Sequence, residues 1–212
     1  MRYDAGMQER SESPGPKRGR RPSPARARMV QSAAMLMRER GIHGVGLREV
    51  VAHSGGPRGS LGRYFPGGKT QLMSEAIDVA LADLNDELER TLAEAETFPE
   101  GIALILAPWR RLLVDHDFAL GCPLAATVVD AADNDELRVH VNDLLARWQG
   151  AVADVYIKFG ASRAVADEEA TVLLAALEGA LILARAHHST GPLDTVERYF
   201  ATAALAAPVA AS

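Results

Sequence analysis

Four side chains that can hydrogen-bond to phosphates or base edges lie close together in this chain of 212 residues. They form one short basic stretch and are Arg58, Ser60, Arg63 and Tyr64. An arginine can donate two parallel hydrogen bonds to guanine, whereas a serine hydroxyl discriminates bases only weakly. A tyrosine hydroxyl can contact a phosphate and so fix the orientation of the protein. These residue types at this spacing predict contacts with a nucleic acid.

Two short helices around a tight turn are expected to position these side chains. The first spans about residues 47–54 and carries apolar residues on one face at helical spacing, namely Leu47, Val50 and Val51. Residues 55–57 (Gly-Gly-Pro) then interrupt it. The second spans about residues 58–64, buries little apolar surface and stops before Pro66. A short basic helix held by a preceding helix and a glycine turn is typical of a helix-turn-helix.

The same stretch resembles the DNA-binding signature of TetR-type transcriptional repressors. In that signature a helix and turn are followed by a basic residue, Gly, Ser or Thr, and Leu, then two further residues, an aromatic pair and proline. This chain carries the motif without a gap, as Arg58-Gly59-Ser60-Leu61 and Tyr64-Phe65-Pro66. The later Gly121-Cys122-Pro123-Leu124 looks most like the LmrA-like subgroup.

The resemblance implies a transcriptional regulator, usually a repressor that leaves a palindromic double-stranded DNA operator when a small molecule binds. Bases are expected to be contacted from the second helix and phosphates by its surroundings, including Lys69, which stands where the family keeps a backbone-contacting lysine. The predicted DNA-contacting residues are Arg48, Arg58, Gly59, Ser60, Arg63, Tyr64 and Lys69. The chain departs from the family at Gly62, where an aromatic residue is usual, and at Arg63, where His or Asn is common. The operator of a relative is therefore not expected to be shared.

Charge is divided unevenly along the chain. Residues 1–70 contain 14 Lys and Arg but five Asp and Glu, whereas residues 71–212 contain nine and 23 respectively. A basic N-terminal third on an acidic body is typical of a polyanion-binding module joined to a domain that avoids DNA. Basic residues between Lys17 and Arg28 contribute to this charge, yet residues 29–70 stay slightly basic without them.

Composition and periodicity predict an all-α protein of about nine helices. A Pro-, Gly-, Ser- and charge-rich tail, residues 1–24, is expected to be disordered, with its basic residues either in a minor groove or solvated. Residues 25–68 are expected to form a three-helix bundle that contains the helix-turn-helix. Residues 69–208 are expected to form a larger helical domain for ligand binding and dimerisation.

A long helix over about residues 69–94 is expected to link the two domains, because its apolar stripe runs through Leu72, Leu84 and Leu92. Residues 100–115 follow as a helix in which Pro108 is expected to introduce a kink and open space. The cleanest helical period of the chain lies in residues 135–159.

The last two long helices, about residues 162–188 and 192–206, combine small and apolar residues. In the TetR family the corresponding helices of two copies form a four-helix dimer interface. Since helix-turn-helix proteins usually contact two half-sites through two-fold symmetry, a homodimer is expected. A buried helix of a monomer is the alternative for the first of these two helices.

Aromatic or soft side chains in the body are candidates to line a pocket for the unidentified effector, and they suit an apolar or flat molecule. The candidates are Trp109, Phe118, Cys122, Trp148 and Tyr156. Each of them also suits an ordinary hydrophobic core.

No catalytic constellation, P-loop or dinucleotide-binding signature emerges, so neither an enzyme nor a cofactor is expected. Cys122 is the lone thiol; a helix start can lower a thiol pKa, but a buried cysteine commonly acts as a small apolar residue. His187 and His188 are adjacent and point apart on a helix, and no histidine has a partner at ligand spacing. No metal site is therefore expected.

A cytoplasmic protein with no membrane partner is expected from three absences. One cysteine excludes an internal disulfide framework, no uninterrupted apolar run reaches about 18 residues, and the N-terminus is polar. Two alternatives remain open. A helical ligand-binding or enzyme-like protein with an incidental basic N-terminus would prefer no DNA sequence, and a non-specific DNA binder would show steep salt dependence without an operator.

Overall fold

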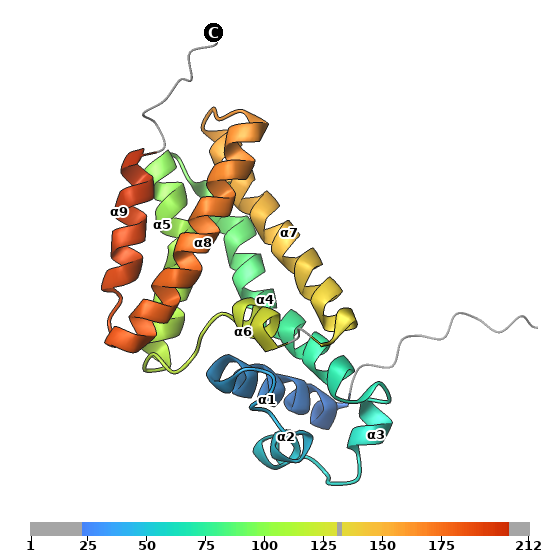
Figure 1. Cartoon of the computed structure of the whole chain (residues 1–212). Coiled ribbons are helices and arrows are strands. Elements are labelled where there is room, and N and C mark those ends of the chain that lie inside the picture. The colour runs from blue at the N-terminus through green and yellow to red at the C-terminus, as the bar shows by residue number, and fades with distance from the viewer. Residues whose placement is uncertain (1–22, 131–132, 204–212) are drawn as a thin grey trace, which may run out of the picture.

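The computed structural model describes residues 23–130 and 133–203, and within these ranges the chain folds into helices without a strand (Figure 1). In chain order the helices are α1 (Pro24–Arg40), α2 (Leu47–His53), α3 (Leu61–Tyr64), α4 (Gly68–Glu94), α5 (Phe98–Asp115), α6 (Pro123–Asp130), α7 (Asp135–Lys158), α8 (Arg163–His187) and α9 (Gly191–Ala203). The predicted all-α class with about nine helices is confirmed. Residues 1–22 of the predicted tail and residues 204–208 lie outside the described residues.

Short polar side chains and glycines determine where the helices begin and end. At the start of α1, the Ser23 Oγ accepts a hydrogen bond from the Arg26 backbone N–H at 3.2 Å, and Pro24 occupies the first turn. Gly41 ends α1 with a φ of +75°, a conformation that suits glycine, and the Asp130 carboxylate lies where a Cβ would stand. Three other helices begin with the same type of side-chain cap, provided by Thr97, Asn134 and Ser162.

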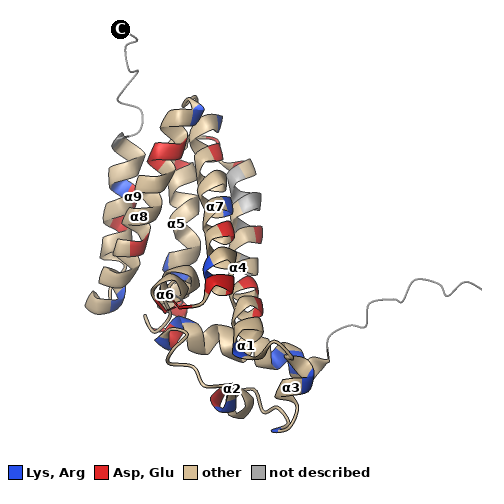
Figure 2. Ribbon diagram, turned by 45° about the vertical axis from the view of Figure 1, so that its right-hand side comes forward, with Lys and Arg blue, Asp and Glu red and all other residues tan. Residues whose placement is uncertain are grey.

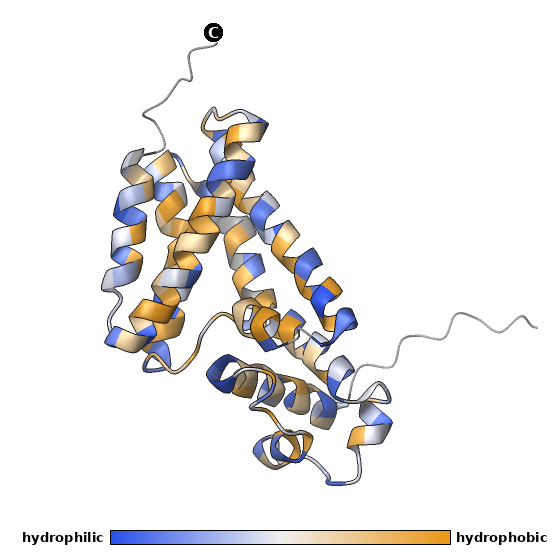
Figure 3. Ribbon diagram, in the orientation of Figure 1, coloured by the Kyte–Doolittle hydropathy of each residue, from blue (hydrophilic) through white to orange (hydrophobic). Residues whose placement is uncertain are grey.

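The long helix α4 connects the two parts of the molecule. Its first half packs along α1 and follows directly after α3, and further along it packs against α5 and α7 (Figure 1). In the body α8 lies between α7 and α9, and α9 also packs against α5. Apolar and polar residues alternate along these helices (Figure 3). Buried apolar residues from α1, α4, α5, α7 and α8 form one hydrophobic core.

The N-terminal bundle shares its core with α4. Met29 and Met37 of α1 are completely buried, as are four residues in the first half of α4, namely Leu72, Met73, Ala76 and Ile77. The predicted stripe of α4 is buried at Leu84 and Leu88, whereas the side chain of Leu92 lies outside the described residues. The bundle that carries the helix-turn-helix therefore depends on the linking helix for part of its core.

Among the described helices, α8 is long and apolar enough to cross a membrane by length and composition. The sequence interrupts it with Glu178, and its inner face is buried at Leu173, Leu177, Leu181 and several alanines. The opposite face still exposes large apolar residues, including Ile182 at 67%. The apolar composition of α8 therefore reflects packing on one face and an uncovered apolar surface on the other.

Candidate DNA-binding interface

The helix α3 is held at its C-terminal end. None of its four residues is buried, but Phe65, which follows it, is 2% exposed. The Arg26 guanidinium of α1 lies 4.9 Å from the centre of the Phe65 ring, and its Nε–H donates to the Tyr64 carbonyl at 3.3 Å. Arg26 also forms an ion pair with Glu75 of α4 at 2.6 Å. Contacts with α1 and α4 thus fix the C-terminal end of α3.

The helix α3 is shorter than predicted, because it begins at Leu61 and not near Arg58. Residues 57–60 form a separate turn in which the Ser60 N–H donates to the Pro57 carbonyl at 3.1 Å. Gly59 lies within this turn and has little preference for a helix, which accounts for the later start. Arg58 and Gly59 are therefore exposed on a turn that precedes α3.

Ser60 differs most from its predicted role as a base-contacting residue. Its side chain is buried, and its hydroxyl donates to the Pro57 carbonyl at 2.7 Å. Ser60 therefore closes the turn with two hydrogen bonds to the Pro57 carbonyl, one from its backbone N–H and one from its hydroxyl. The geometry gives Ser60 a structural function in shaping the turn and leaves it unexposed to a bound nucleic acid.

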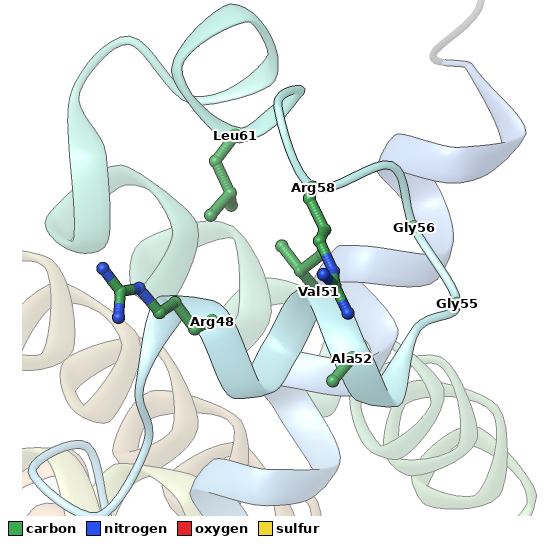
Figure 4. A pocket seen from close by; sticks show the side chains of 7 residues that line it. All are labelled: Arg48, Val51, Ala52, Gly55, Gly56, Arg58 and Leu61. Carbon is green, nitrogen blue, oxygen red and sulfur yellow. The ribbon is translucent and has the colours of Figure 1, made fainter.

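Two cations flank an apolar groove between α2 and the turn (Figure 4). Arg48, the second residue of α2, and Arg58, in the turn, are both exposed. Within the described ranges neither guanidinium has an ion pair or a hydrogen bond, whereas Arg40 nearby is paired with Glu49 at 2.6 Å. The groove has a volume of about 650 Å³ and is lined by Val51, Ala52, Gly55, Gly56 and Leu61 as well as the two arginines. The uncompensated charge at this face favours a polyanion.

The exposed Arg63 and the half-buried Tyr64 form a pair on α3. The Arg63 Nη2–H donates to the Tyr64 hydroxyl at 3.1 Å, and the guanidinium carbon lies 4.9 Å from the centre of the tyrosine ring. Hydrogen bonds from Ser23 and from Arg63 lower the pKa of Tyr64. The stacking holds the Arg63 guanidinium outside the helix, where its remaining N–H groups stay available.

Lys69 is the second residue of α4, so it lies beside the free backbone N–H groups of a 27-residue helix. Its side chain is half-buried, and in the described parts of the chain its ammonium group has no hydrogen-bond or ion-pair partner. No acidic residue occurs in the first turn of α4. A lysine at a helix N-terminus, where the helix dipole also attracts anions, is suited to a phosphate.

The predicted ligand-lining residues do not gather around one cavity. Trp109 and Trp148 do meet, edge to face with ring centres 5.4 Å apart, and both are buried. The Trp148 Nε1–H donates to Asn85 at 2.6 Å. Tyr156, also buried, packs its ring edge-on against Phe98 at 5.1 Å. These three aromatic residues fill the core between α4, α5 and α7.

The other two candidates lie at the junction between the body and α1. The Phe118 ring packs on His188 with ring centres 4.6 Å apart, and its backbone has a φ of +59°. Cys122 is 5% exposed, and burial together with the nearby Glu178 carboxylate raises its pKa well above the usual range. Cys122 lines a groove of about 380 Å³ between α1, α6 and α8. This burial agrees with the interpretation of Cys122 as a small apolar residue and not with a thiol activated by a helix start.

Sequence reasoning missed the polar contacts that tie the body to α1. The Arg185 guanidinium of α8 donates to the carbonyls of Phe118, Ala119 and Glu39 at 2.9–3.3 Å. The Gly121 N–H donates to the Arg38 carbonyl at 3.1 Å, and the Arg38 Nε–H donates back to the Gly121 carbonyl at 3.3 Å. The His43 N–H donates to the Asp130 carboxylate at 3.0 Å. Gly121 is the one residue in the sequence whose type hints at this close contact. A Cβ at this position would come within 2.8 Å of the Arg185 guanidinium.

The charged side chains divide as the sequence predicts. Lys and Arg gather on α1, α2 and α3, whereas Asp and Glu are spread over the helices of the body (Figure 2). A short helix following a glycine turn, with exposed arginines at one basic end of a helical protein, defines a helix-turn-helix DNA-binding regulator.

Comparisons with known proteins agree with this class. The family model "Bacterial regulatory proteins, tetR family" matches residues 30–76, and "Transcriptional regulator LmrA/YxaF-like, C-terminal domain" matches residues 99–199. The HTH-type transcriptional regulator Rv0196 of Mycobacterium tuberculosis is 39% identical over 82% of this chain and 90% of its own length. LmrA of Bacillus subtilis is 28% identical over 80% of this chain and 90% of its own. The chain belongs to the TetR family of transcriptional regulators, with an LmrA/YxaF-like C-terminal domain, and the predicted family and subgroup are confirmed.

Solved structures show the same fold. A TetR transcriptional regulator from Chloroflexus aurantiacus is 25% identical, with a TM-score of 0.68 over 84% of this chain and 92% of its own. The regulatory protein TetR from Rhodobacter sphaeroides is 20% identical, with a TM-score of 0.76 over 84% and 98%. Regulators of this family bind DNA operators, are typically dimers and are generally not enzymes.

Proposed function

We propose that this protein is a homodimeric, ligand-responsive repressor that binds a palindromic operator through the face formed by α3, the preceding turn and the start of α2. The observation that carries the proposal is that Arg48 and Arg58, near Arg63 of α3, are exposed and have no ion-pair or hydrogen-bond partner within the described residues. Exposed cations without acidic partners are expected to gain more from phosphates and bases than cations that are already paired inside the protein.

The residues take different roles in this proposal. Arg58 and Arg63 enter the major groove, where a two-pronged arginine discriminates guanine from other bases. Arg48, Tyr64 and Lys69 contact phosphates from three different elements and so fix the orientation of α3. Gly59, which has no side chain, lets the turn approach the DNA backbone closely. In this arrangement residues 23–68 act as the DNA-binding unit and residues 69–203 as the ligand-binding and dimerising unit.

The homodimer is proposed to form through α8 and α9. Both helices expose large apolar residues, with Leu183 of α8 49% and Tyr199 of α9 63% exposed. Between them lies a groove of about 670 Å³ lined by small residues such as Ala176 and Gly179, which permit close approach of another helix. When the same surface of a second copy packs against it under two-fold symmetry, the exposed apolar residues of both copies are buried.

Replacement of Leu183 by Asp tests the dimer. We expect L183D to sediment as a monomer at concentrations where the wild type is a dimer, and to lose affinity for the operator. Val139→Asp is the matched control, because Val139 is 53% exposed on α7 and lies outside the α8–α9 surface. A dimeric L183D, or a V139D that also dissociates, would refute this interface.

A binding titration tests the function itself. Fluorescent DNA from upstream of the coding region of this protein is titrated with the wild-type protein at physiological salt, beside a shuffled duplex of the same length. A preference of about a thousandfold or more is expected, since specific regulators exceed their own non-specific affinity by roughly that factor. Equal affinities that both collapse with salt, on this DNA and on a genome-derived library, would contradict a sequence-specific regulator.

A further inference from the structure

The connection between α5 and α6, residues 116–122, has a strained backbone where it leaves α5. Asp117 and Phe118 are adjacent, neither is a glycine, and both have a positive φ, of +50° and +59° respectively. Such residues persist only where their surroundings hold them in place. The Phe118 ring packs on His188, and the Asp117 carboxylate lies 3.0 Å from the Nε2 of the same histidine. The end of α8 therefore helps to hold this connection.

The Arg185 guanidinium, in the last turn of α8, fastens the same connection to α1. Its Nε–H donates to the Phe118 carbonyl at 3.3 Å, and its Nη2–H donates to the carbonyls of Ala119 at 2.9 Å and Glu39 at 3.3 Å. Glu39 lies in the last turn of α1, where carbonyls lack a helical partner and where the helix dipole attracts a cation. Since α1 itself packs mainly on α2, α4 and α6, this side chain bridges α8 and the DNA-binding unit.

Gly121 leaves the room that the Arg185 guanidinium occupies. A Cβ at position 121 would lie 2.8 Å from the Arg185 Nη1, which is closer than a Cβ normally approaches another atom. The Gly121 backbone is also fixed to α1, because its N–H donates to the Arg38 carbonyl at 3.1 Å and its carbonyl accepts from the Arg38 Nε–H at 3.3 Å. A side chain at position 121 could therefore be accommodated only if the guanidinium moved.

The two ends of this bridge belong to parts of the molecule with different proposed functions. On α8, within one turn of Arg185, Ile182 and Leu183 expose apolar side chains beside or within the proposed dimer surface. On α1, the completely buried Met29 and Met37 belong to the core of the DNA-binding bundle. A change at the bridge would therefore alter how each DNA-binding unit is oriented relative to the two-fold axis of the dimer.

We propose that Arg185 is a positioning residue, which clamps the α5–α6 connection to the end of α1 and so holds the two DNA-binding units of the dimer at the spacing of the operator half-sites. Half-sites of helix-turn-helix dimers lie about one helical turn of DNA apart, roughly 34 Å. A dimer that samples several spacings binds the operator more weakly, in proportion to the fraction of molecules that have the matching spacing. The effect on DNA rests on the proposed repressor function, whereas the clamp itself does not.

Hydrogen–deuterium exchange of the full-length protein tests the clamp without DNA. Arg185→Ala is expected to raise the exchange rate of the backbone amides in residues 116–122, including the Gly121 N–H, about tenfold. Arg147→Ala is the matched control, since Arg147 is an exposed arginine of α7 that donates to the Asp143 carbonyl of its own helix at 3.3 Å. Unchanged exchange in Arg185→Ala, or an equal rise in both variants, would overturn the clamp.

The spacing of the half-sites tests the positioning. Duplexes carry the preferred palindrome with its natural spacer, the palindrome with one base pair added to the spacer, or a single half-site. Arg185→Ala is expected to bind the natural palindrome about tenfold more weakly than the wild type does, and to bind the single half-site within about twofold of it. The added base pair should weaken binding less in Arg185→Ala than in the wild type. An equal spacer penalty in both proteins, or equal losses on palindrome and half-site, would show a merely structural role and overturn the proposal.

Gly121→Ala displaces the guanidinium without removing its charge. It is expected to reduce the spacer penalty as Arg185→Ala does, and the double variant should bind the palindrome no more weakly than Arg185→Ala, because the same clamp is lost in both. Additive losses would contradict a shared clamp. Circular dichroism, thermal melting and sedimentation verify that each variant is a folded dimer. The preference of the wild type for the palindrome over a shuffled duplex tests the repressor function by itself, so that function can fail while the exchange experiment upholds the clamp.

Discussion

Replacing Lys69 by Ala gives the most quantitative test of the proposed interface. The ammonium group lies at the N-terminus of α4 without a partner in the described ranges, so the substitution removes a phosphate contact and little internal structure. A dimer loses two such contacts. The slope of log K against log salt is therefore expected to become shallower by ~1.8, at ~0.9 for each phosphate contact. Raising the salt from about 50 to 200 mM is therefore expected to weaken DNA binding by the wild type about 12-fold more than it weakens DNA binding by K69A.

The assay is fluorescence anisotropy on the preferred duplex and on a shuffled duplex, at four or more salt concentrations. Because a phosphate contact carries no sequence information, the loss should be the same on both duplexes. Arg147→Ala is the control, since Arg147 is an exposed cation of α7 in the acidic body. An unchanged salt slope in K69A, or a loss confined to the preferred duplex, would refute the assignment of Lys69 to a phosphate.

Three further predictions concern Arg63, Glu178 and Cys122. Arg63→Ala should reduce the ratio of specific to non-specific affinity by about tenfold for each half-site, because a base contact is lost; equal losses on both duplexes in the same anisotropy assay would argue against a base contact. Burial raises the pKa of Glu178, so the folded state holds this proton more tightly than the unfolded state. Stability is consequently lost as pH rises from the unfolded pKa through the folded pKa, and Glu178→Gln should gain melting temperature over the wild type across that window and keep the gain above it. A difference in melting temperature that does not depend on pH would contradict this. The Cys122 thiol, whose pKa is raised by burial, should react with Ellman's reagent far more slowly in the native protein than after unfolding at the same pH; rapid labelling of the native protein would show that the thiol is accessible.

The sequence predicted those features that depend on local signals. Proline and glycine mark the ends of α1, which starts at Pro24 after the capping Ser23 and ends before Gly41. Pro123 opens α6, and the periodic stretch after Asn134 forms α7. Capping, glycine and periodicity act within a few residues of the chain, so they can be recognised without the fold.

The features that were missed depend on contacts between distant residues. The Arg185 side chain bonds to a carbonyl 146 residues away at Glu39, and no periodic pattern announces such a contact. The shorter α3 results from competition between a helix and the Pro57–Ser60 turn, which the buried Ser60 hydroxyl decides in favour of the turn. Aromatic residues such as Trp109 and Tyr156 suit either a pocket or a core, and only the packing of α4, α5 and α7 places them in the core.

The shared core of α1 and α4 also limits how this protein can evolve. Leu72, Met73 and Ile77 have no exposed surface, and a chain cut after residue 68 would lack all three, losing ~5–9 kcal/mol of burial. That loss is comparable to the whole stability of a small domain, roughly 5–15 kcal/mol. A fusion protein that joins residues 23–68 alone to a foreign sensor domain is therefore expected to have an unfolded DNA-binding bundle. A junction for domain exchange must therefore lie beyond Ile77, so that the first half of α4 stays with the DNA-binding bundle.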